Sequence, residues 1–333
     1  MAQATNFFPS QNVSVWYQAE TNVGDQPDDA GLKKLQTTGF TIPEASFPLE
    51  FSSPRSGQFT TTDSQGHHSQ GTKMWTFETT LRGTPDSILL ATGAVYEDTS
   101  SEAVLNNNYT FPTATYLNGA SSATTFEIRF EDGGADTTLN NLVCQGCIGT
   151  GFTITEDIGS EGGEMVVTIQ WATAYVPQYG GDAISSAAYD TGSAFNIRSL
   201  TAASSEIDSG NDMVIESWEL SVSRTIERVH YKDTTDGTYE PFGYVMTGPF
   251  EVTGSMTIIR NDDVHDLLAN FYNSAVVDIN ITDGTFVLSA DKCLLGEATI
   301  DNGGAVLKNT IPFVVVGADD ISSATKMLGI TTS

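Results

Sequence analysis

Two runs of residues in the second half of the chain alternate between apolar and polar side chains. The first run places Trp218 and Leu220 on one face and Glu219 and Glu227 on the other, and the second run has Glu251 among its polar positions. A period of two residues is typical of half-buried antiparallel strands. Because an Asp-Gly pair marks a turn between the runs, we predict one long hairpin with an extended polar tip. The runs are residues 216–230 and 250–259, and the tip is residues 230–241.

A short helix is predicted in each half of the chain. In the second half, Asn261 is suited to cap a helix over residues 261–272, and the aspartates that follow suit the positive end of the helix dipole. In the first half, an alternating run at residues 75–82 precedes a helix over residues 85–95, with Thr84 as its cap and a proline at its first position.

A spacing pattern occurs twice in the chain. Leu-x4-Cys-x5-Thr-Ile begins at Leu142 and again at Leu288, so Cys147 and Cys293 occupy matching positions. Further segments match in the same order, and we interpret the chain as a tandem duplication. Aligning the two helices leaves the preceding strands one residue out of phase, and we expect a bulge or single insertion near Gly83 to account for this. The further matches join residues 79–91 with 257–269, and residues 126–133 with 277–284.

These patterns predict a mainly β protein with two tandem β-sandwich or β-barrel copies, each with a long hairpin and one short packed helix. We expect the first copy at residues 1–181 and the second at residues 213–333. Residues 182–212, rich in Ser, Ala and Gly, are the predicted linker. The polar stretch 96–122 is predicted to be a surface loop inserted in the first copy.

Composition narrows the range of functions. The 333 residues, 39% of them hydrophobic, suit two folded domains, and no apolar run is long enough to span a membrane. The first residues lack the pattern of a secretory signal, so we expect assembly in the cytoplasm. A net charge of −28 leaves too few Lys and Arg for a broad nucleic-acid-binding face. Many acids and few lysines also suit a high-salt environment.

Metal-ligand residue types occur without a full ligand set. Cys144 and Cys147 form a C-x2-C pair that supplies two ligands, and we interpret them as core residues. His67 and His68 are adjacent in a polar loop, and His230 has no evident partner. Helix capping accounts for the remaining cluster, so we expect no metal and no cofactor. That cluster is Asp262, Asp263, His265 and Asp266.

Catalytic motifs are absent from the sequence. There is no Gly-x-Ser-x-Gly, P-loop or dinucleotide fingerprint. With 42 acidic residues, some carboxylate pair always has a plausible spacing, so such pairs carry little information. We expect the protein not to be an enzyme.

The polar side of the hairpin has two interpretations. Glu219, Glu227 and Glu251 lie among Ser and Thr without large apolar groups. This face is either an ordinary solvated surface or the wall of an aqueous channel that repels a passing polyanion.

The combined features resemble the major tail tube protein of long-tailed (siphovirus-type) bacteriophages and archaeal tailed viruses, in a form with a duplicated domain. The resemblance is carried by the hairpin, by the helix that follows it, and by the strands predicted after that helix; the start of the chain also resembles this family. The segments are residues 218–259, 261–272, 276–281, 293–300 and 13–27.

The resemblance implies a structural virion protein of the tail, without catalysis. Three chains would form a ring, and stacked rings would make a β-barrel tube whose acidic lumen conducts DNA during ejection. The implied partners are further copies of the chain, the tape-measure protein, and the tail terminator and tip proteins. The candidate ring-stacking positions, besides the loop at residues 53–70, are Lys232, Asp233, Asp236, Gly237 and Tyr239.

A binding or decoration module is the alternative. Tandem β-sandwiches on a virion or cell surface also have this fold class, and Asp25, Asp28 and Asp29 could form a calcium cluster on a loop. Such a module has no need of a long hairpin with acids on its polar side.

Overall fold

The computed structural model gives the fold of most of the chain. For the backbone alone it describes residues 49–51, 66–68, 102, 106, 161, 230–232 and 239–242. Together with these, it describes residues 13–20, 23–24, 31–44, 73–96, 103–105, 125–131, 141–180, 184, 188–197, 205–208, 210–232, 239–261, 276–283, 285–317 and 326–332.

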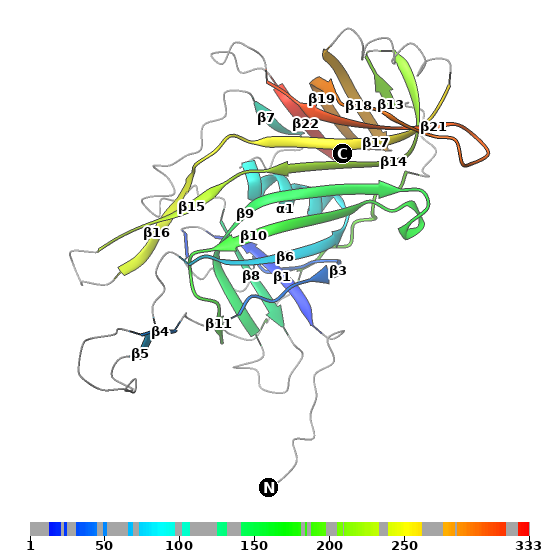
Figure 1. The fold of residues 1–333 in the computed structure, drawn as a ribbon. Helices are drawn as coiled ribbons and strands as arrows, with labels where there is room; N and C mark the ends of the chain where they lie inside the picture. The colour runs from blue at the N-terminus through cyan, green and yellow to red at the C-terminus, as the bar shows by residue number, and fades with distance from the viewer. Residues whose placement is uncertain are drawn as a thin grey trace, which may run out of the picture.

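The chain is mainly β, as predicted, with one α-helix in the described part (Figure 1). The elements of the first half are β1 (Ser14–Ala19), β2 (Lys33–Lys34), β3 (Thr37–Phe40), β4 (Leu49–Phe51), β5 (Gly66–His68), β6 (Trp75–Arg82), α1 (Pro85–Tyr96), β7 (Glu102–Asn106), β8 (Phe126–Glu131), β9 (Asn141–Asp157), β10 (Val166–Thr173), β11 (Gln178–Tyr179) and β12 (Ala188–Tyr189). Those of the second half are β13 (Ser205–Ile207), β14 (Asn211–Ser223), β15 (Ile226–Lys232), β16 (Tyr239–Met246), β17 (Glu251–Ile259), β18 (Val276–Asp283), β19 (Phe286–Leu295), β20 (Thr299–Asp301), β21 (Lys308–Val315) and β22 (Lys326–Thr332).

A central antiparallel sheet joins the two halves. Its order is β3-β6-β10-β9-β14-β17-β21-β20. The joint between the halves is the pairing of β9 with β14, where Ile154 faces Leu220 and Phe152 faces Val222. All four of these side chains are fully buried. The pairing therefore fuses both halves around one hydrophobic core.

One face of the central sheet is covered and the other is open. The predicted alternation is confirmed in β6 and β14, where Trp75, Leu81 and Trp218 are buried. Helix α1 lies behind the sheet in Figure 1, and further strands complete the covering layer. Aromatic contacts join the layers: Phe77 meets Phe130 of β8 with ring centroids 5.6 Å apart. In the second half, Trp218 of β14 stacks on Phe286 of β19, with ring centroids 5.8 Å apart.

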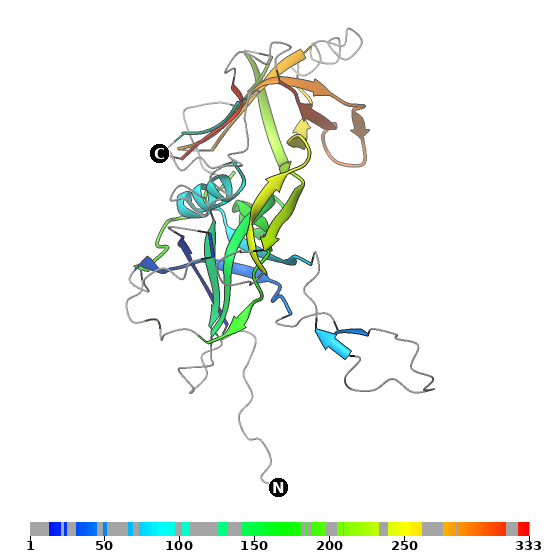
Figure 2. The same cartoon turned by 90° about the vertical axis from the view of Figure 1, so that its left-hand side faces the viewer.

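The predicted long hairpin is present and bends at residue 224. β14 pairs with β17 in the central sheet, and β15 pairs with β16 beyond it. We call β15 and β16 the second arm. The first half has a shorter equivalent, in which β3 pairs with β6 and β4 pairs with β5. We call β4 and β5 the first arm; it stands away from the central sheet in Figures 1 and 2.

Helix α1 begins where the sequence predicts. The backbone N–H of Ser87 donates to Oγ1 of Thr84 at 3.2 Å, and the Thr84 N–H donates to Oγ of Ser87 at 2.9 Å. This reciprocal pair satisfies donors that a helix start leaves open. Apart from its cap Asn261, the helix predicted at residues 262–272 lies outside the described residues.

The same pairing scheme occurs in both halves, down to its irregularities. Phe126 pairs with Cys147, and Val277 pairs with Cys293. One residue later each pair of strands shifts register, between residues 126 and 128 and between residues 277 and 279. Both cysteine thiols also donate to the backbone oxygen three residues before them.

The hairpin registers give an alignment of the two strands that precede the predicted helices. Leu81 pairs with Thr37, and Ile258 pairs with Ile215, each just before a register shift in the partner strand. By this pairing Thr257 corresponds to Thr80, one residue later than the sequence match of residue 79 with residue 257. The difference has the size of the single insertion expected near Gly83.

Two expectations need revision. The polar stretch at residues 96–122 is not simply a surface loop, because Ala103 and Leu105 are buried and β7 pairs with β22 of the second half. The predicted linker contains two short strands, of which β12 pairs with β2 and β13 pairs with β14 and β18. A polar composition concealed β7 because only alternate residues of a strand need to be apolar.

Two carboxyl groups are buried beside the β9–β14 joint. Glu156 is 2% exposed, Asp283 is 4% exposed, and the indole N–H of Trp218 donates to Oε2 of Glu156 at 2.6 Å. Burial and the neighbouring Asp283 raise the pKa of Glu156 to about 9, and burial raises the pKa of Asp283 as well. The pair therefore holds a proton at neutral pH.

The pair should make stability fall as pH rises. Its folded pKa lies above the unfolded one, so its stabilisation is full below about pH 4 and is lost as pH rises toward about 9. Glu156→Gln should gain stability relative to the wild type over that range, by up to about 1.4 kcal/mol per pH unit, in urea unfolding. Glu219→Gln, an exposed carboxylate on the same sheet, is the control. Parallel pH profiles for Glu156→Gln and the wild type would contradict the assignment.

Candidate functional surface

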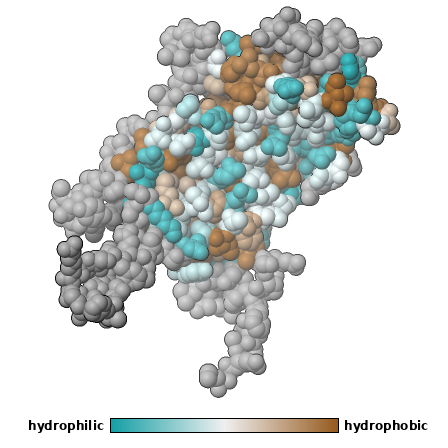
Figure 3. Space-filling model, viewed as in Figure 1, coloured by the Kyte–Doolittle hydropathy of each residue, from teal (hydrophilic) through white to brown (hydrophobic). Residues whose placement is uncertain are grey.

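The open side of the central sheet is a broad surface of small polar side chains. We call it the polar face. Figure 3 shows it as mainly pale, with teal areas within it and brown areas toward the margins. It follows from the alternation, because each strand that buries its apolar residues turns its Ser and Thr residues outward. One row across the sheet is Thr80, Thr168, Thr153, Ser221 and Thr253.

Hydroxyl groups on neighbouring strands of the polar face form hydrogen bonds with one another. Thr168 Oγ1 donates to Thr80 Oγ1 at 3.3 Å, and Thr153 Oγ1 donates to Ser221 Oγ at 3.4 Å. The hydroxyls of Thr257 and Thr310 lie 3.0 Å apart. Cross-strand pairs of this kind stabilise a sheet and leave a smooth face.

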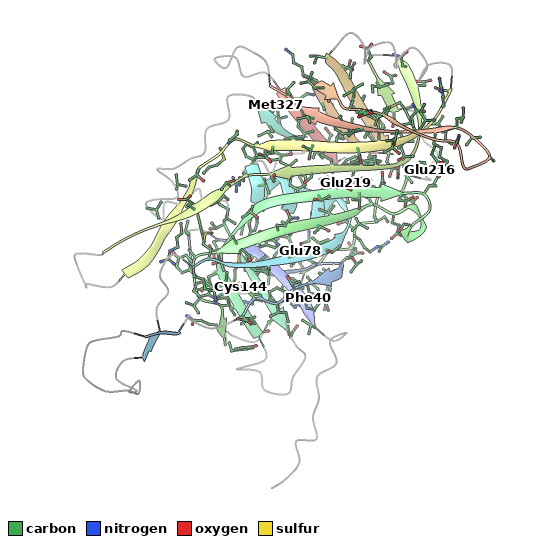
Figure 4. All side chains as sticks on the ribbon, in the orientation of Figure 1. Phe40, Glu78, Cys144, Glu216, Glu219 and Met327 are labelled. Carbon is green, nitrogen blue, oxygen red and sulfur yellow. The ribbon has the colours of Figure 1, made fainter. Side chains whose placement is uncertain are left out.

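Acidic side chains dominate the charge of the polar face. Glu78, Glu219 and Glu251 are exposed on β6, β14 and β17, and Figure 4 labels the first two on the strands facing the viewer. Among the described outward positions of the central strands, two are cationic, and both are paired. Arg82 forms two hydrogen bonds with Glu164, at 2.7 and 3.0 Å, and Lys308 meets Glu216 at 2.6 Å. The surface therefore presents uncompensated negative charge.

The candidate channel residues fall in two places. Glu219 and Glu251 lie on the polar face, opposite Ser255 and Ser223 respectively. Glu227 is exposed too, but it belongs to the second arm, beyond the central sheet. Glu78 was missed by the sequence reasoning, although its outward position follows from the alternation of β6.

The candidate stacking positions lie at the end of the second arm. Lys232 and Tyr239 form the last described backbone pair of β15 and β16. Asp233, Asp236 and Gly237, between them, are outside the described residues.

The two outermost strands of the central sheet carry exposed isoleucines. Ile42, just after β3, is 47% exposed, and Ile300 of β20 is 57% exposed. By register these positions match two residues of the β9–β14 joint. Ile300 corresponds to Ile154, because Ile300 pairs with Asn309 of β21 in the way that Ile154 pairs with Val167 of β10. Ile42 corresponds to Leu220, because both lie at the same distance along the chain after a register shift, in β3 and in β14 respectively. Unpaired edges of this kind are templates for another strand.

The second arm is seated on the first half of the chain. Tyr244 is fully buried; its hydroxyl donates to the backbone oxygen of Gly146 and accepts from the N–H of Ala174 at 3.0 Å. A small apolar cluster surrounds it, in which Ile148 is fully buried. Arg224 fixes the base of the arm, since its guanidinium donates to backbone oxygens of residues 149 and 94 at 3.1 and 2.9 Å.

Another buried carboxyl group supports this seat. Glu20 accepts hydrogen bonds from the N–H groups of Gly24 and Gly146, at 2.9 and 2.7 Å, and from the hydroxyl of Thr125 at 2.8 Å. Burial nevertheless raises its pKa to about 7. Gly146 has a positive φ of 58°, which favours glycine at this turn in β9.

The metal candidates find no support in the described residues. No group of three His, Cys, Asp or Glu residues there could hold an ion. The three cysteines are buried and unpaired by disulfides, and burial raises the pKa of Cys147 well above its usual range and that of Cys293 to about 12. Cys147 and Cys293 therefore remain neutral thiols. The cluster at residues 262–266 and the aspartates at residues 25, 28 and 29 lie outside the described part.

The polar face also has a shallow hollow over β6 and β10. Its lining includes Thr41, Glu78, Thr150 and Gln170. It offers one carboxylate and no cation, which is a poor basis for binding an anion or for nucleophilic chemistry. Among the described helices, none is long and apolar enough to cross a membrane.

The chain matches no known protein-family model and no curated protein sequence.

Proposed function

We propose that this chain is a ring-forming structural protein of the tail-tube type, with the polar face of its central sheet as the wall of a lumen. The observation that carries the proposal is the β9–β14 joint: the described part of the chain contains one such joint and exposes the matching residues, Ile42 and Ile300, at its two outer edges. A joint that occurs once within a chain and can recur between chains generates a closed ring when its rotation closes.

A duplicated domain is part of the proposal. The two halves share strand order, register and the position of the irregular steps in the sheet. Each half then supplies four strands to the central sheet, and each contributes a hairpin with an arm. In the tail-tube family six domains complete a ring, so three chains of this type would be needed.

The proposed joint between chains has a defined register. In this joint, β3 of one copy takes the position of β14, and β20 of the next copy takes the position of β9. Ile42 then lies opposite Ile300, as Leu220 lies opposite Ile154 within the chain. Both isoleucines would then leave water, as Leu220 and Ile154 do within the chain. Closing a sheet into a barrel removes the open edges, which are otherwise an aggregation hazard.

The chemistry of the polar face suits the passage of DNA. Glu78, Glu219 and Glu251 would repel phosphate groups, and the row from Thr80 to Thr253 offers no large apolar side chain on which a base could stack. The two cations near one end of the face are held by Glu164 and Glu216. We propose repulsion and rigidity as the role of this surface, with the tape-measure protein, the terminator and the tip proteins as partners, and the virion tail as location.

Ring formation is the first test of the function. Negative-stain electron microscopy of the purified chain, across protein and salt concentration, should show three-fold rings, stacked or single, with a stain-filled lumen. High salt should favour them, because it screens the repulsion between chains of net charge −28. Persistent monomers under all conditions, with tape-measure protein added, would favour the binding or decoration module.

Edge variants should separate head-to-tail joining from other association. Ile42→Asp and Ile300→Asp should each remain monomeric in native mass spectrometry, because each introduces a charge into one side of the joint. A mixture of the two should form one-to-one pairs and stop there, since each variant keeps the edge that the other lacks. Ile158→Asp, at an exposed isoleucine on the turn between β9 and β10, is the control and should form rings.

Cross-linking should verify the register. With Ile42→Cys and Ile300→Cys in one chain, a short bis-maleimide should link neighbouring copies into a ladder that ends at three chains. The native cysteines are buried and should not react. Pairing Ile42→Cys with Asp301→Cys moves one cysteine to the opposite face of β20 and should reduce the yield. Equal yields from both pairs would contradict the register.

A further inference from the structure

The second half of the chain exposes an apolar patch made of three neighbouring strands. Val276 of β18 pairs with Leu294 of β19, and Leu294 pairs with Val314 of β21. Their exposed fractions are 49%, 42% and 45%. We call these residues the apolar patch.

The matching site in the first half is covered. Ile148 pairs with Ala172 as Leu294 pairs with Val314, and Ile148 and Ala172 are 0% and 2% exposed. The cover is the second arm, whose Tyr244 belongs to the same apolar cluster as Ile148. The two halves thus have one seat each, and within the described part of the chain no arm covers the seat in the second half.

The first arm has the backbone register to fill such a seat. In the second arm, Arg228 pairs with Tyr244 and Val229 pairs with Gly243. In the first arm, Glu50 pairs with His67 and Phe51 pairs with Gly66. When the two hairpins are aligned by the register shifts in β3 and β14, residue 67 of the first arm therefore corresponds to residue 244 of the second arm. A glycine also precedes this position in both arms, Gly66 in the first and Gly243 in the second.

The first arm of a chain cannot reach the apolar patch of that chain without leaving its place. In Figures 1 and 2, β4 and β5 lie near the end of the molecule that carries β11, whereas β18 and β19 lie at the opposite end. The second arm extends from its own half across the joint to the neighbouring half. The first arm, at the outer edge of the sheet, extends in the same sense but away from the chain.

We propose that the first arm of one copy docks on the apolar patch of the next copy, as the second arm docks on the first half. The occupant of the patch is thus a second copy of this chain. This inference rests on the proposed head-to-tail association, and it adds a second contact, distinct from the β3–β20 edge. It also gives the two strands of the first arm a role between neighbouring chains, where the sequence had suggested contacts between stacked rings.

A cysteine-pairing experiment tests the arm. Chains with His67→Cys alone are mixed with chains carrying Val314→Cys alone, under conditions that form rings, and treated with a short bis-maleimide. A covalent dimer is expected in at least about tenfold higher yield than for His67→Cys mixed with Val214→Cys, because docking raises the effective concentration of the two thiols. Val214 is a matched control, since it is also a strand valine, 51% exposed, at the other end of the sheet.

The outcomes distinguish this inference from the proposed function. If Ile42→Cys and Ile300→Cys cross-link while His67→Cys and Val314→Cys do not, the ring stands and the docking of the arm is wrong. If the arm pair cross-links without the edge pair, the arm docks but the proposed edge register is wrong. If neither pair exceeds its control, both are wrong. A dimer formed equally with Val214→Cys would also overturn the docking of the arm.

Discussion

The pairing of β9 with β14 is the constraint on which the rest of the structure depends. β9 runs for 17 residues and serves two layers, since its first part pairs with β8 and its last part joins the central sheet. Gly151 permits the close approach at this joint, because a Cβ there would lie 2.7 Å from the backbone oxygen of Val222. Without the joint, the central sheet would divide into two sheets of four strands, connected through the pairing of β7 with β22, and the second arm would lose its seat on the first half.

Both proposed contacts between chains repeat the arrangement found around this joint within the chain. The β3 edge and the first arm lie next to each other in sequence, as β14 and the second arm do around the bend at residue 224. Edge pairing aligns the backbone, and the arm then covers side chains that the edge cannot reach. An edge of a few residues is a weak contact by itself, and a seated arm makes the association larger and more apolar.

The sequence predicted those features that depend on local pattern. Alternation located the long hairpin, and Thr84 with Pro85 located the start of α1. The repeated cysteine spacing pointed to positions that share register in the structure. Features that depend on pairing between distant segments were not predictable. Nothing local distinguishes β7 from a polar loop, or shows that β9 continues past Gly146 to meet β14. The acidic character of the polar face was predicted in part, while Glu227 proved to lie on an arm and Glu78 was overlooked.

The pairing of β7 with β22 has a consequence for how the protein is made. Asn106 pairs with Lys326, about 220 residues further along the chain (326 minus 106). At typical synthesis rates, β7 therefore emerges from the ribosome on the order of 10 to 40 s before its partner. Ala103 and Leu105, both buried in the finished fold, are exposed for that interval. Contacts so distant also make folding slow, so completion of this sheet is a late event in folding that protection of β7 by a chaperone would favour.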